Sequence, residues 1–276
     1  MLPLRDANPR LKVPVVTLLL IGLNVAAFLL WQPTLRGGDD AEFEQQTFFW
    51  CHGLIPFEVA HGQPLARSGR EGARAIENDY AQLGGPQIAG EELQAYLADE
   101  CPDKSPWLSV FTSMFLHGGW LHIIGNMLFL WVFGDNVEDR LGKIGFVLFY
   151  LAGGVAAGAL QFVFAPDSTI PNVGASGAVA AVLGAYLFLY PRARVLTGVA
   201  LIFLWTLVEL PAIVVLGFWF VLQLFSGFAG LGAEVNSGVA YWAHVGGFAF
   251  GFLFALLALR RRGGTRAIPA RPDGWG

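Results

Sequence analysis

Long apolar runs separated by short polar segments dominate this chain. A bilayer core about 30 Å thick is crossed by a helix of about 20 apolar residues. We interpret the runs as six membrane spans: 13–32, 118–134, 144–164, 174–190, 211–229 and 241–259. The apolar stretch 198–210 ends at Pro211, and we interpret it as an interfacial or partly buried lead-in to the fifth span. The pattern therefore predicts an all-α membrane protein, a bundle of six transmembrane helices.

Composition agrees with a membrane protein. Of the 276 residues, 55% are hydrophobic and only 14% are charged, and the mean hydropathy is +0.54. A soluble domain carries about 25% charged residues. The net charge of −4 comes with no basic stripe, so no nucleic-acid partner is predicted. Two cysteines are too few for a disulfide framework or a zinc site, and no metal or cofactor is predicted.

The positions of Lys and Arg predict the orientation, because basic loops stay in the cytoplasm. With six spans, 12 of the 17 basic residues fall on one side: Arg5, Arg10, Lys12, Arg140, Lys143, Arg192, Arg194, Arg260, Arg261, Arg262, Arg266 and Arg271. Both termini are then cytoplasmic, residues 1–12 as a short N-terminus and 260–276 as a basic tail. We expect a multi-pass integral protein of a bacterial cytoplasmic membrane, with the lipid bilayer as its surroundings.

The segment 33–107 falls outside in this topology. It carries 13 acidic and five basic residues, so we expect a long acidic extracytoplasmic loop. The stretch "EELQAYLADE" within it predicts a short helix. Cys51 and Cys101 both lie in this loop, where the surroundings are oxidising. They are either two unrelated thiols or one bridge that brackets the loop. Residues 108–259 form the remaining core.

Polar residues gather at the outer ends of three spans. The second span carries His117, His122 and Asn126, the fourth carries Ser176, and the sixth carries His244. Spans two, four and six all enter from the outer face, so these residues share one leaflet. Alone, the serine is explained by close helix packing and each histidine by a hydrogen bond between helices. Together, polar groups in one leaflet indicate a functional site.

This set of residues fits nucleophilic catalysis. A serine hydroxyl becomes a nucleophile when an imidazole takes its proton, and Ser176 and His244 supply this pair. An oxyanion needs donors, which Asn126, His122 and the Ser176 backbone N–H offer at a helix start. No acid that would orient His244 is evident, because carboxylates are nearly absent from the spans and Glu209 belongs to the opposite side, so we expect a dyad. Small residues would let the two helices approach closely: Gly177, Gly184, Gly247 and Gly251.

The order and spacing of these residues resemble one known family. His117, His122 and Asn126 follow the pattern H-x4-H-x3-N, Ser176 lies in "GASG", and His244 lies in "AH-x-GG". On alternate spans, this combination is similar to the rhomboid intramembrane serine proteases, over residues 105–259. The resemblance implies a rhomboid-type six-helix bundle with Ser176 as nucleophile and His244 as base. It implies oxyanion donors from Asn126, His122 and the Ser176 backbone, with His117 as a possible accessory residue.

The resemblance also implies an activity, which is endopeptidase cleavage of single-pass or other transmembrane proteins near the outer membrane face. Span five would lie where substrate enters from the side. One position departs from well-described members, which carry a Tyr four residues after the nucleophile, packed on the catalytic His. Here that position is Ala180, so the group that braces His244 must come from elsewhere, and Trp242 and Tyr241 are two candidates.

Two other interpretations remain open at this point. A proteolytically inactive relative could bind membrane clients, although intact Ser176 and His244 argue against it. A transporter, channel or metal site could use the histidines, but no inverted repeat is visible in the sequence and Ser and Asn suit a metal poorly.

Overall fold

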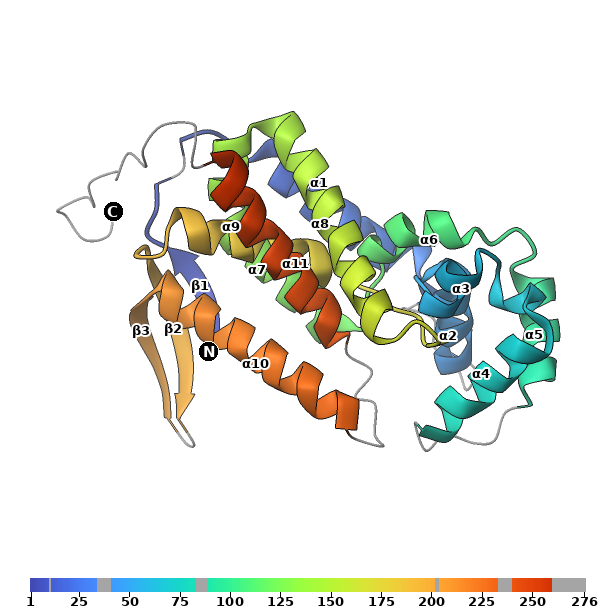
Figure 1. The fold of residues 1–276 in the computed structure, drawn as a ribbon. Coiled ribbons are helices and arrows are strands. Elements are labelled where there is room, and N and C mark those ends of the chain that lie inside the picture. Colours follow the sequence, from blue (N-terminus) through green and yellow to red (C-terminus); the bar gives the residue numbers. More distant parts are fainter. Residues whose placement is uncertain (10, 34–40, 83–88, 202–203, 233–239, 260–276) are drawn as a thin grey trace.

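The computed structural model describes residues 1–9, 11–33, 41–82, 89–201, 204–232 and 240–259, and most of them are helical (Figure 1). Every predicted span falls on a helix. These six are α1 (Val15–Ala26) with η1 (Ala27–Trp31), α7 (Trp120–Leu141), α8 (Lys143–Phe164), α9 (Ser176–Leu189), α10 (Ala212–Gly232), and α11 (Tyr241–Phe254) with η5 (Ala255–Leu259).

Helix length supports several membrane crossings. Among the described residues, three helices are long and apolar enough to cross a bilayer: α8, α10, and α11 with η5. A fourth crossing is possible where α7 follows the segment Pro106–Phe115 at a bend of 80°. The stretches Val15–Trp31 and Ser176–Leu189 are apolar but shorter. The protein is therefore a multi-pass membrane protein, and length alone supports three or four of the six predicted crossings.

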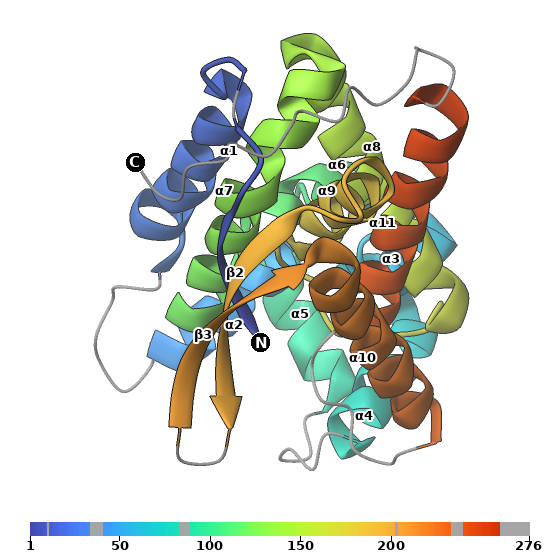
Figure 2. The ribbon, with the colours of Figure 1, turned by 90° about the vertical axis from the view of Figure 1, so that its left-hand side faces the viewer.

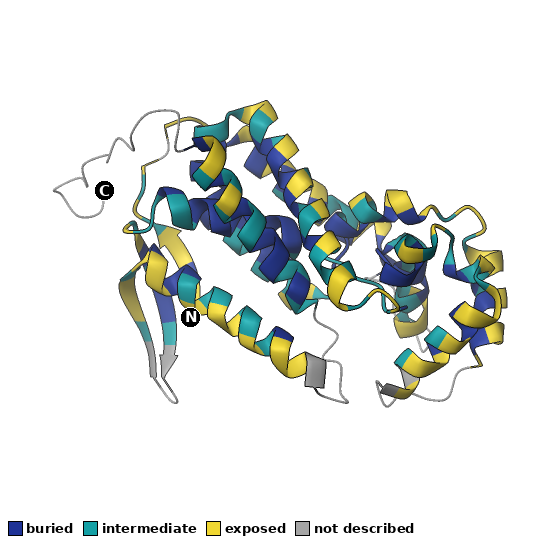
Figure 3. Ribbon diagram, viewed as in Figure 1, coloured by how far each residue is buried: buried dark blue, intermediate teal, exposed yellow. Residues whose placement is uncertain are grey.

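Helix α9 lies at the centre of the helical core and packs against α7, α8 and α11 (Figures 1 and 3). Its residues from Gly177 to Tyr186 are all buried. They are small or apolar, which suits a helix surrounded by other helices on all sides. The helix ends at Leu189, just before Pro191, which lacks an N–H and cannot continue a helix. A helix enclosed in this way does not have to match the bilayer thickness.

The described chain also contains a three-stranded antiparallel sheet, which corrects the all-α prediction. The strands β1 (Leu2–Asp6), β2 (Arg194–Leu201) and β3 (Leu204–Pro211) lie in the order β1-β2-β3 (Figure 2). The stretch predicted as a lead-in to span five forms most of this hairpin. Its β-branched residues suit a strand, and the N-terminal residues supply the backbone partners for β2. The sheet lies at the end of the core opposite residues 41–82 and 89–100 (Figure 1).

Side chains fasten strand β1 to the helical core. The Tyr186 hydroxyl of α9 donates to Asp6 Oδ2 at 2.6 Å, and Asn136 Nδ2 of α7 donates to the same oxygen at 3.1 Å. The Asn8 amide donates to the Tyr186 hydroxyl at 2.8 Å. Burial, together with the nearby Asp135 carboxylate, raises the pKa of Asp6 to about 7. In the folded protein this carboxyl is therefore mostly protonated below a pH of about 7.

The insert spans residues 33–107, and its residues 41–82 and 89–107 form a small unit at the other end of the core. Its described elements are α2 (Ala41–His52), α3 (Pro56–His61), η3 (Leu65–Arg67), α4 (Gly69–Gln82) and α5 (Gly90–Glu100), and α5 confirms the predicted short helix. After the insert, α6 (Pro106–Thr112) and η4 (Ser113–Phe115) lead into α7. The insert has its own apolar cluster: Trp50, Ile55, Phe57, Leu65, Ile76, Leu93 and Leu97.

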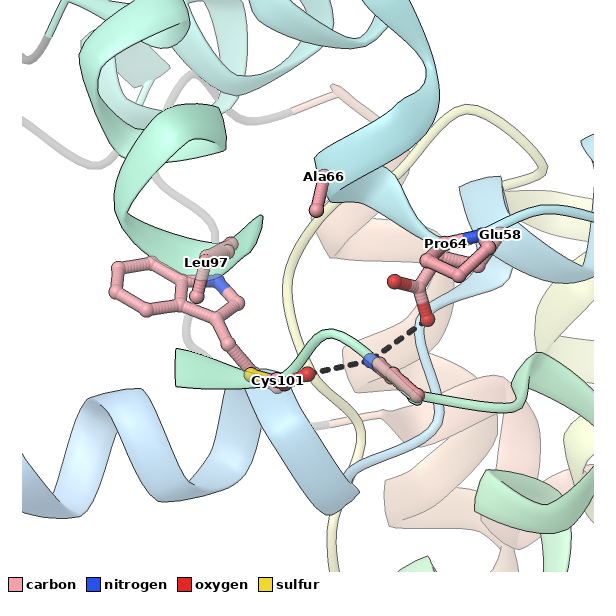
Figure 4. Close-up of a pocket in the computed structure, with 7 residues that line it drawn as sticks. Glu58, Pro64, Ala66, Leu97 and Cys101 are labelled. Carbon is pink, nitrogen blue, oxygen red and sulfur yellow. Dashed lines mark hydrogen bonds and ion pairs between the residues drawn. The ribbon is translucent and has the colours of Figure 1, made fainter. Parts of the chain in front are cut away.

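Two further contacts hold the insert together. Cys51 and Cys101 form a disulfide, so the bridge, rather than two unrelated thiols, is the correct alternative. Lys104 and Glu58 form an ion pair at 2.6 Å with side chains only 4% and 1% exposed. Lys104 also donates to the Trp50 carbonyl (Figure 4). A buried ion pair of this kind needs such additional hydrogen bonds to offset the lost hydration.

We expect the attachment of β1 to weaken as the pH rises. A carboxyl whose pKa is raised in the folded state stabilises that state fully below its ordinary pKa of 3.8. This contribution is lost as the pH rises through the folded pKa of about 7. Hydrogen exchange measured by mass spectrometry should show that β1 amides lose up to about a hundredfold in protection between pH 5 and pH 9, after correction for intrinsic exchange, because about two units of the pKa difference are lost in this range. The Asp6→Asn variant should lose this pH dependence, while α9 amides stay equally protected in both proteins. Equal β1 protection at both pH values in the wild type would contradict the role of Asp6.

Candidate functional site

Ser176 is the first residue of α9, at a sharp change in backbone direction. Gly174, two residues earlier, has a φ of 134°, a conformation that suits glycine. Its N–H donates to the Ser113 carbonyl at 2.9 Å, which fixes the loop against η4. A helix start leaves backbone N–H groups without helical partners. The Ser176 hydroxyl and backbone N–H therefore lie together where the loop becomes a helix.

His244 of α11 contacts Ser176 directly. Its Nε2 lies 2.8 Å from Ser176 Oγ. On the other side of the ring, Nδ1 lies 2.8 Å from Oε1 of Gln223 in α10. An amide oxygen only accepts, so the proton belongs on Nδ1. Nε2 is then left with a lone pair, which can accept the proton of the Ser176 hydroxyl.

Glycine makes this contact possible by letting α9 and α11 approach closely. A β-carbon at Gly247 would overlap the carbonyl oxygen of Gly177, and one at Gly251 would overlap that of Ala181. From the other helix, a β-carbon at Gly184 would overlap the Phe248 carbonyl. Close backbone approach was the role predicted for these glycines. The two helices can therefore bring Ser176 and His244 within hydrogen-bond distance.

The structure places His122 beside the loop that leads to Ser176. A β-carbon at Gly174 would lie 2.8 Å from the His122 Nε2, so only glycine fits there. The Gly118 N–H donates to His122 Nδ1 at 3.2 Å, which leaves the hydrogen on Nε2. The ring N–H of His122 thus lies on the side of the loop. Ser176 Oγ lies near the same place, 3.4 Å from the position of a β-carbon at Gly174.

Asn126 and His117 occupy buried positions near His122. Asn126 lies one turn further along α7, on the same face as His122. Its amide nitrogen is buried and has no hydrogen-bond partner in the part of the chain that the structure describes. The His117 ring packs edge-on against His122, with 5.1 Å between centroids. Its backbone exchanges two hydrogen bonds with the Gln32 amide, both 2.9 Å, so His117 also joins α7 to the end of η1.

The residues that surround His244 differ in part from the prediction. Tyr241 lies edge-on to its ring at 6.4 Å, as the sequence suggested. Trp242 was the wrong alternative, because it stacks on Phe164 at 3.7 Å instead. Trp219 of α10 lies 5.9 Å from the His244 ring, and Gln223 binds it. Gln223 was not among the predicted site residues, although an amide within the apolar run 211–229 is a signal that indicates a functional position.

A small cavity of about 50 Å³ opens beside Ser176. Most of its lining on α8 and α9 is glycine and alanine, including Ala157, Gly158 and Ala178, and the longer side chain of Gln161 in α8 also lines it. A cavity of this size holds a small side chain or a few water molecules. The nucleophile candidate thus has empty space next to its oxygen.

The fold and the site together define a multi-pass membrane protein with a half-buried Ser–His pair between two tightly packed helices. Residues 104–261, more than half of the chain, match the Rhomboid domain. The chain therefore belongs to the rhomboid family of serine proteases.

Named relatives agree with this assignment. The chain is 37% identical to Rhomboid protease GluP of Bacillus subtilis over 109 residues, which are 39% of this chain and 21% of GluP. It is 28% identical to Putative rhomboid protease YdcA of the same organism over 156 residues, 56% of this chain and 69% of YdcA. It is 40% identical to Rhomboid-like protein 11, chloroplastic, of Arabidopsis thaliana over 73 residues, 26% of each chain. The chain thus spans about a fifth of GluP and a quarter of the plant protein.

The packing of α9 on α11 makes a specific prediction for Gly251→Ala. The new methyl group would press on the Ala181 carbonyl, and such overpacking costs about 1–3 kcal/mol in the free energy of unfolding. Thermal unfolding in detergent should measure this loss. The matched control is Gly217→Ala in α10, where a β-carbon meets nothing within 4 Å. Equal stability of the two variants would refute the close approach of the helices.

Proposed function

We propose that this protein is an intramembrane serine endopeptidase with Ser176 as nucleophile and His244 as general base. The single observation that carries the proposal is the 2.8 Å contact between Ser176 Oγ and His244 Nε2. His244 accepts the hydroxyl proton as Oγ attacks the scissile carbonyl, and a tetrahedral adduct forms. His244 then returns the proton to the leaving amine as the adduct collapses to an acyl-enzyme. A water molecule, activated by the same imidazole, releases the acyl group from Ser176.

Three donors would stabilise the negative charge on the attacked carbonyl oxygen. They are the Asn126 amide, the His122 ring N–H and the Ser176 backbone N–H. Two observations support this role: the amide nitrogen of Asn126 has no partner among the described residues, and His122 lies beside Gly174. One donor of this kind contributes about 10²–10³ in rate. His117 would act as an accessory residue, since it packs against His122.

Gln223 would position His244 in place of a carboxylate. Its Oε1 accepts from Nδ1, which holds the imidazole in the tautomer that can act as a base. A neutral amide does this without adding a second charge to a site enclosed by apolar helices. The catalytic pair is then a dyad supported by one amide.

We assign six membrane spans with both termini in the cytoplasm. The ends of α7, α9 and α11 that carry His122, Ser176 and His244 all lie on the side of the insert (Figure 1). The sheet end carries Arg5, Arg140 and Arg194, which agrees with the distribution of basic residues. The insert is then extracytoplasmic and 108–259 is the protease core. The predicted basic tail, 260–276, lies outside the described residues.

The substrates would be single-pass or other transmembrane proteins, cut near the outer face of a bacterial cytoplasmic membrane. The site lies near the insert-facing ends of the helices, and the relatives GluP and YdcA are named a rhomboid protease and a putative rhomboid protease. Both facts support this assignment.

A serine-reactive fluorophosphonate probe tests the proposal on detergent-solubilised protein. The wild type should be labelled and should cleave a co-expressed transmembrane substrate, because Ser176 is activated. Ser176→Ala should abolish both. The matched control, Ser226→Ala in α10, should behave as the wild type. A folded wild type without labelling or cleavage would favour a client-binding or transport role and refute the protease.

Substitution of Gln223 tests the positioning of His244. Gln223→Leu removes the acceptor for Nδ1, and a neutral hydrogen bond is worth about 0.5–1.5 kcal/mol. The turnover number should therefore fall about three- to tenfold, with unchanged thermal stability. Gln223→Glu keeps an acceptor oxygen and should recover most of the rate at neutral pH. If both variants lose activity equally, the acceptor is not what matters at this position.

A further inference from the structure

The insert supplies part of the wall of the cavity beside Ser176. Leu54, between α2 and α3, lines this cavity together with Ser176. Its Cδ2 would lie 3.0 Å from a β-carbon at Gly158, so the side chain faces the glycine wall of α8. Leu54 precedes the residues that match the Rhomboid domain, which begin at 104. The insert therefore adds a residue to a cavity that otherwise belongs to the protease core.

Leu54 is one of the few long side chains that limit the size of the cavity. Most of the wall on α8 and α9 is glycine or alanine and does not extend beyond a methyl group. Met114 also lines the cavity, and its Sδ and Cε fill the space over Gly154. Because the cavity has a volume of only about 50 Å³, each carbon of the Leu54 side chain affects the size of the group that can enter it.

Backbone hydrogen bonds fix Leu54 in this place. Its N–H donates to the Asn172 carbonyl at 3.2 Å, and the Asn172 N–H donates back to the Leu54 carbonyl at 2.7 Å. The adjacent Gly53 allows the two segments to meet, since a β-carbon there would lie 3.0 Å from Pro171 Cβ. Asn172 is four residues before Ser176. The position of Leu54 relative to Ser176 is therefore set by a short stretch of chain.

Other parts of the insert bind the same loop. The Phe57 N–H donates to the Ser168 carbonyl at 3.0 Å. The Thr169 N–H and hydroxyl both donate to Asp79 Oδ2 of α4, at 2.5 and 2.8 Å. The Cys51–Cys101 disulfide lies three residues from Leu54 and ties α2 to the end of α5. The wall formed by Leu54 is thus rigidly supported and cannot easily move aside for a larger group.

We propose that Leu54 determines specificity by limiting the size of the substrate side chain that precedes the scissile bond. This rests on the proposed function, because the carbonyl that Ser176 attacks belongs to that substrate residue. Its side chain must then lie beside Ser176, where the cavity opens. A pocket that is one methylene too small or too large changes selectivity by about 10- to 200-fold. The insert is therefore a component of the substrate-binding site.

The test uses two peptidyl chloromethyl ketones that are identical except for Ala or Leu next to the reactive group. Their second-order inactivation rates are measured on the full-length protein by loss of fluorophosphonate labelling. The wild type should react faster with the Ala compound. In Leu54→Ala, the ratio of the Ala rate to the Leu rate should fall at least about tenfold, because the cavity has gained room.

Leu65→Ala is the matched control. It makes the same change in the insert core, where Leu65 is 1% exposed and does not line the cavity. Its stability should fall, since Leu→Ala in a core costs about 2–5 kcal/mol, but its rate ratio should match the wild type. Leu54→Val removes only one methylene, so it should shift the rate ratio in the same direction by a smaller factor. This variant keeps the test available if Leu54→Ala does not fold.

Several results would overturn the role of Leu54. The first is a wild type that reacts equally fast with both ketones. The second is a wild type that the fluorophosphonate labels but that reacts with neither ketone. The third is a rate ratio that stays unchanged in every folded Leu54 variant. A ratio that shifts as much in Leu65→Ala would also overturn it. A wild type that the fluorophosphonate does not label even without a ketone is a different outcome, and it would count against the proposed protease function.

Discussion

The contact between Ser176 and His244 depends on two helix backbones that approach until no side chain fits between them. Helices in a bilayer gain no hydrophobic free energy from packing together, since lipid tails are as apolar as their side chains. Association then relies on close van der Waals contact, which small residues allow. Gly184, Gly247 and Gly251 provide it where α9 meets α11. The short, buried helix α9 is held in the centre by this packing, with Ser176 at its start.

Polar groups within the apolar core are stabilised by partners on other helices. His244 of α11 contacts Ser176 of α9 on one side and Gln223 of α10 on the other. Burying such groups without partners would cost several kcal/mol, about 2–7 for an amide or hydroxyl. The hydrogen bonds therefore fix the relative rotation of three helices as well as the tautomer of the imidazole. The same contacts that satisfy these groups produce the arrangement that our proposed mechanism uses.

Segments outside the helices secure both ends of the core. At one end, strand β1 binds α7 and α9 through Asp6, and the sheet continues directly into α10. At the other end, the insert binds residues 168–172, the loop that leads to Ser176. The insert remains compact through its own apolar cluster, a disulfide and a buried ion pair. The loop that leads to the nucleophile is thereby fixed against the insert.

The sequence alone determined the features that depend on local patterns. Apolar runs are long because lipid surrounds them, so all six predicted spans fall on helices. Ser176 and His244 were identifiable because polar residues stand out within such runs. Tertiary structure decided what depends on segments far apart in the chain. Strand β2 needs β1 for its hydrogen bonds, the Cys51–Cys101 pairing needs the folded insert, and the contacts of Gln223 and Leu54 exist only after α10 and the insert have packed. Pairing of this kind is set by the three-dimensional arrangement, which the periodicity of a single segment does not contain.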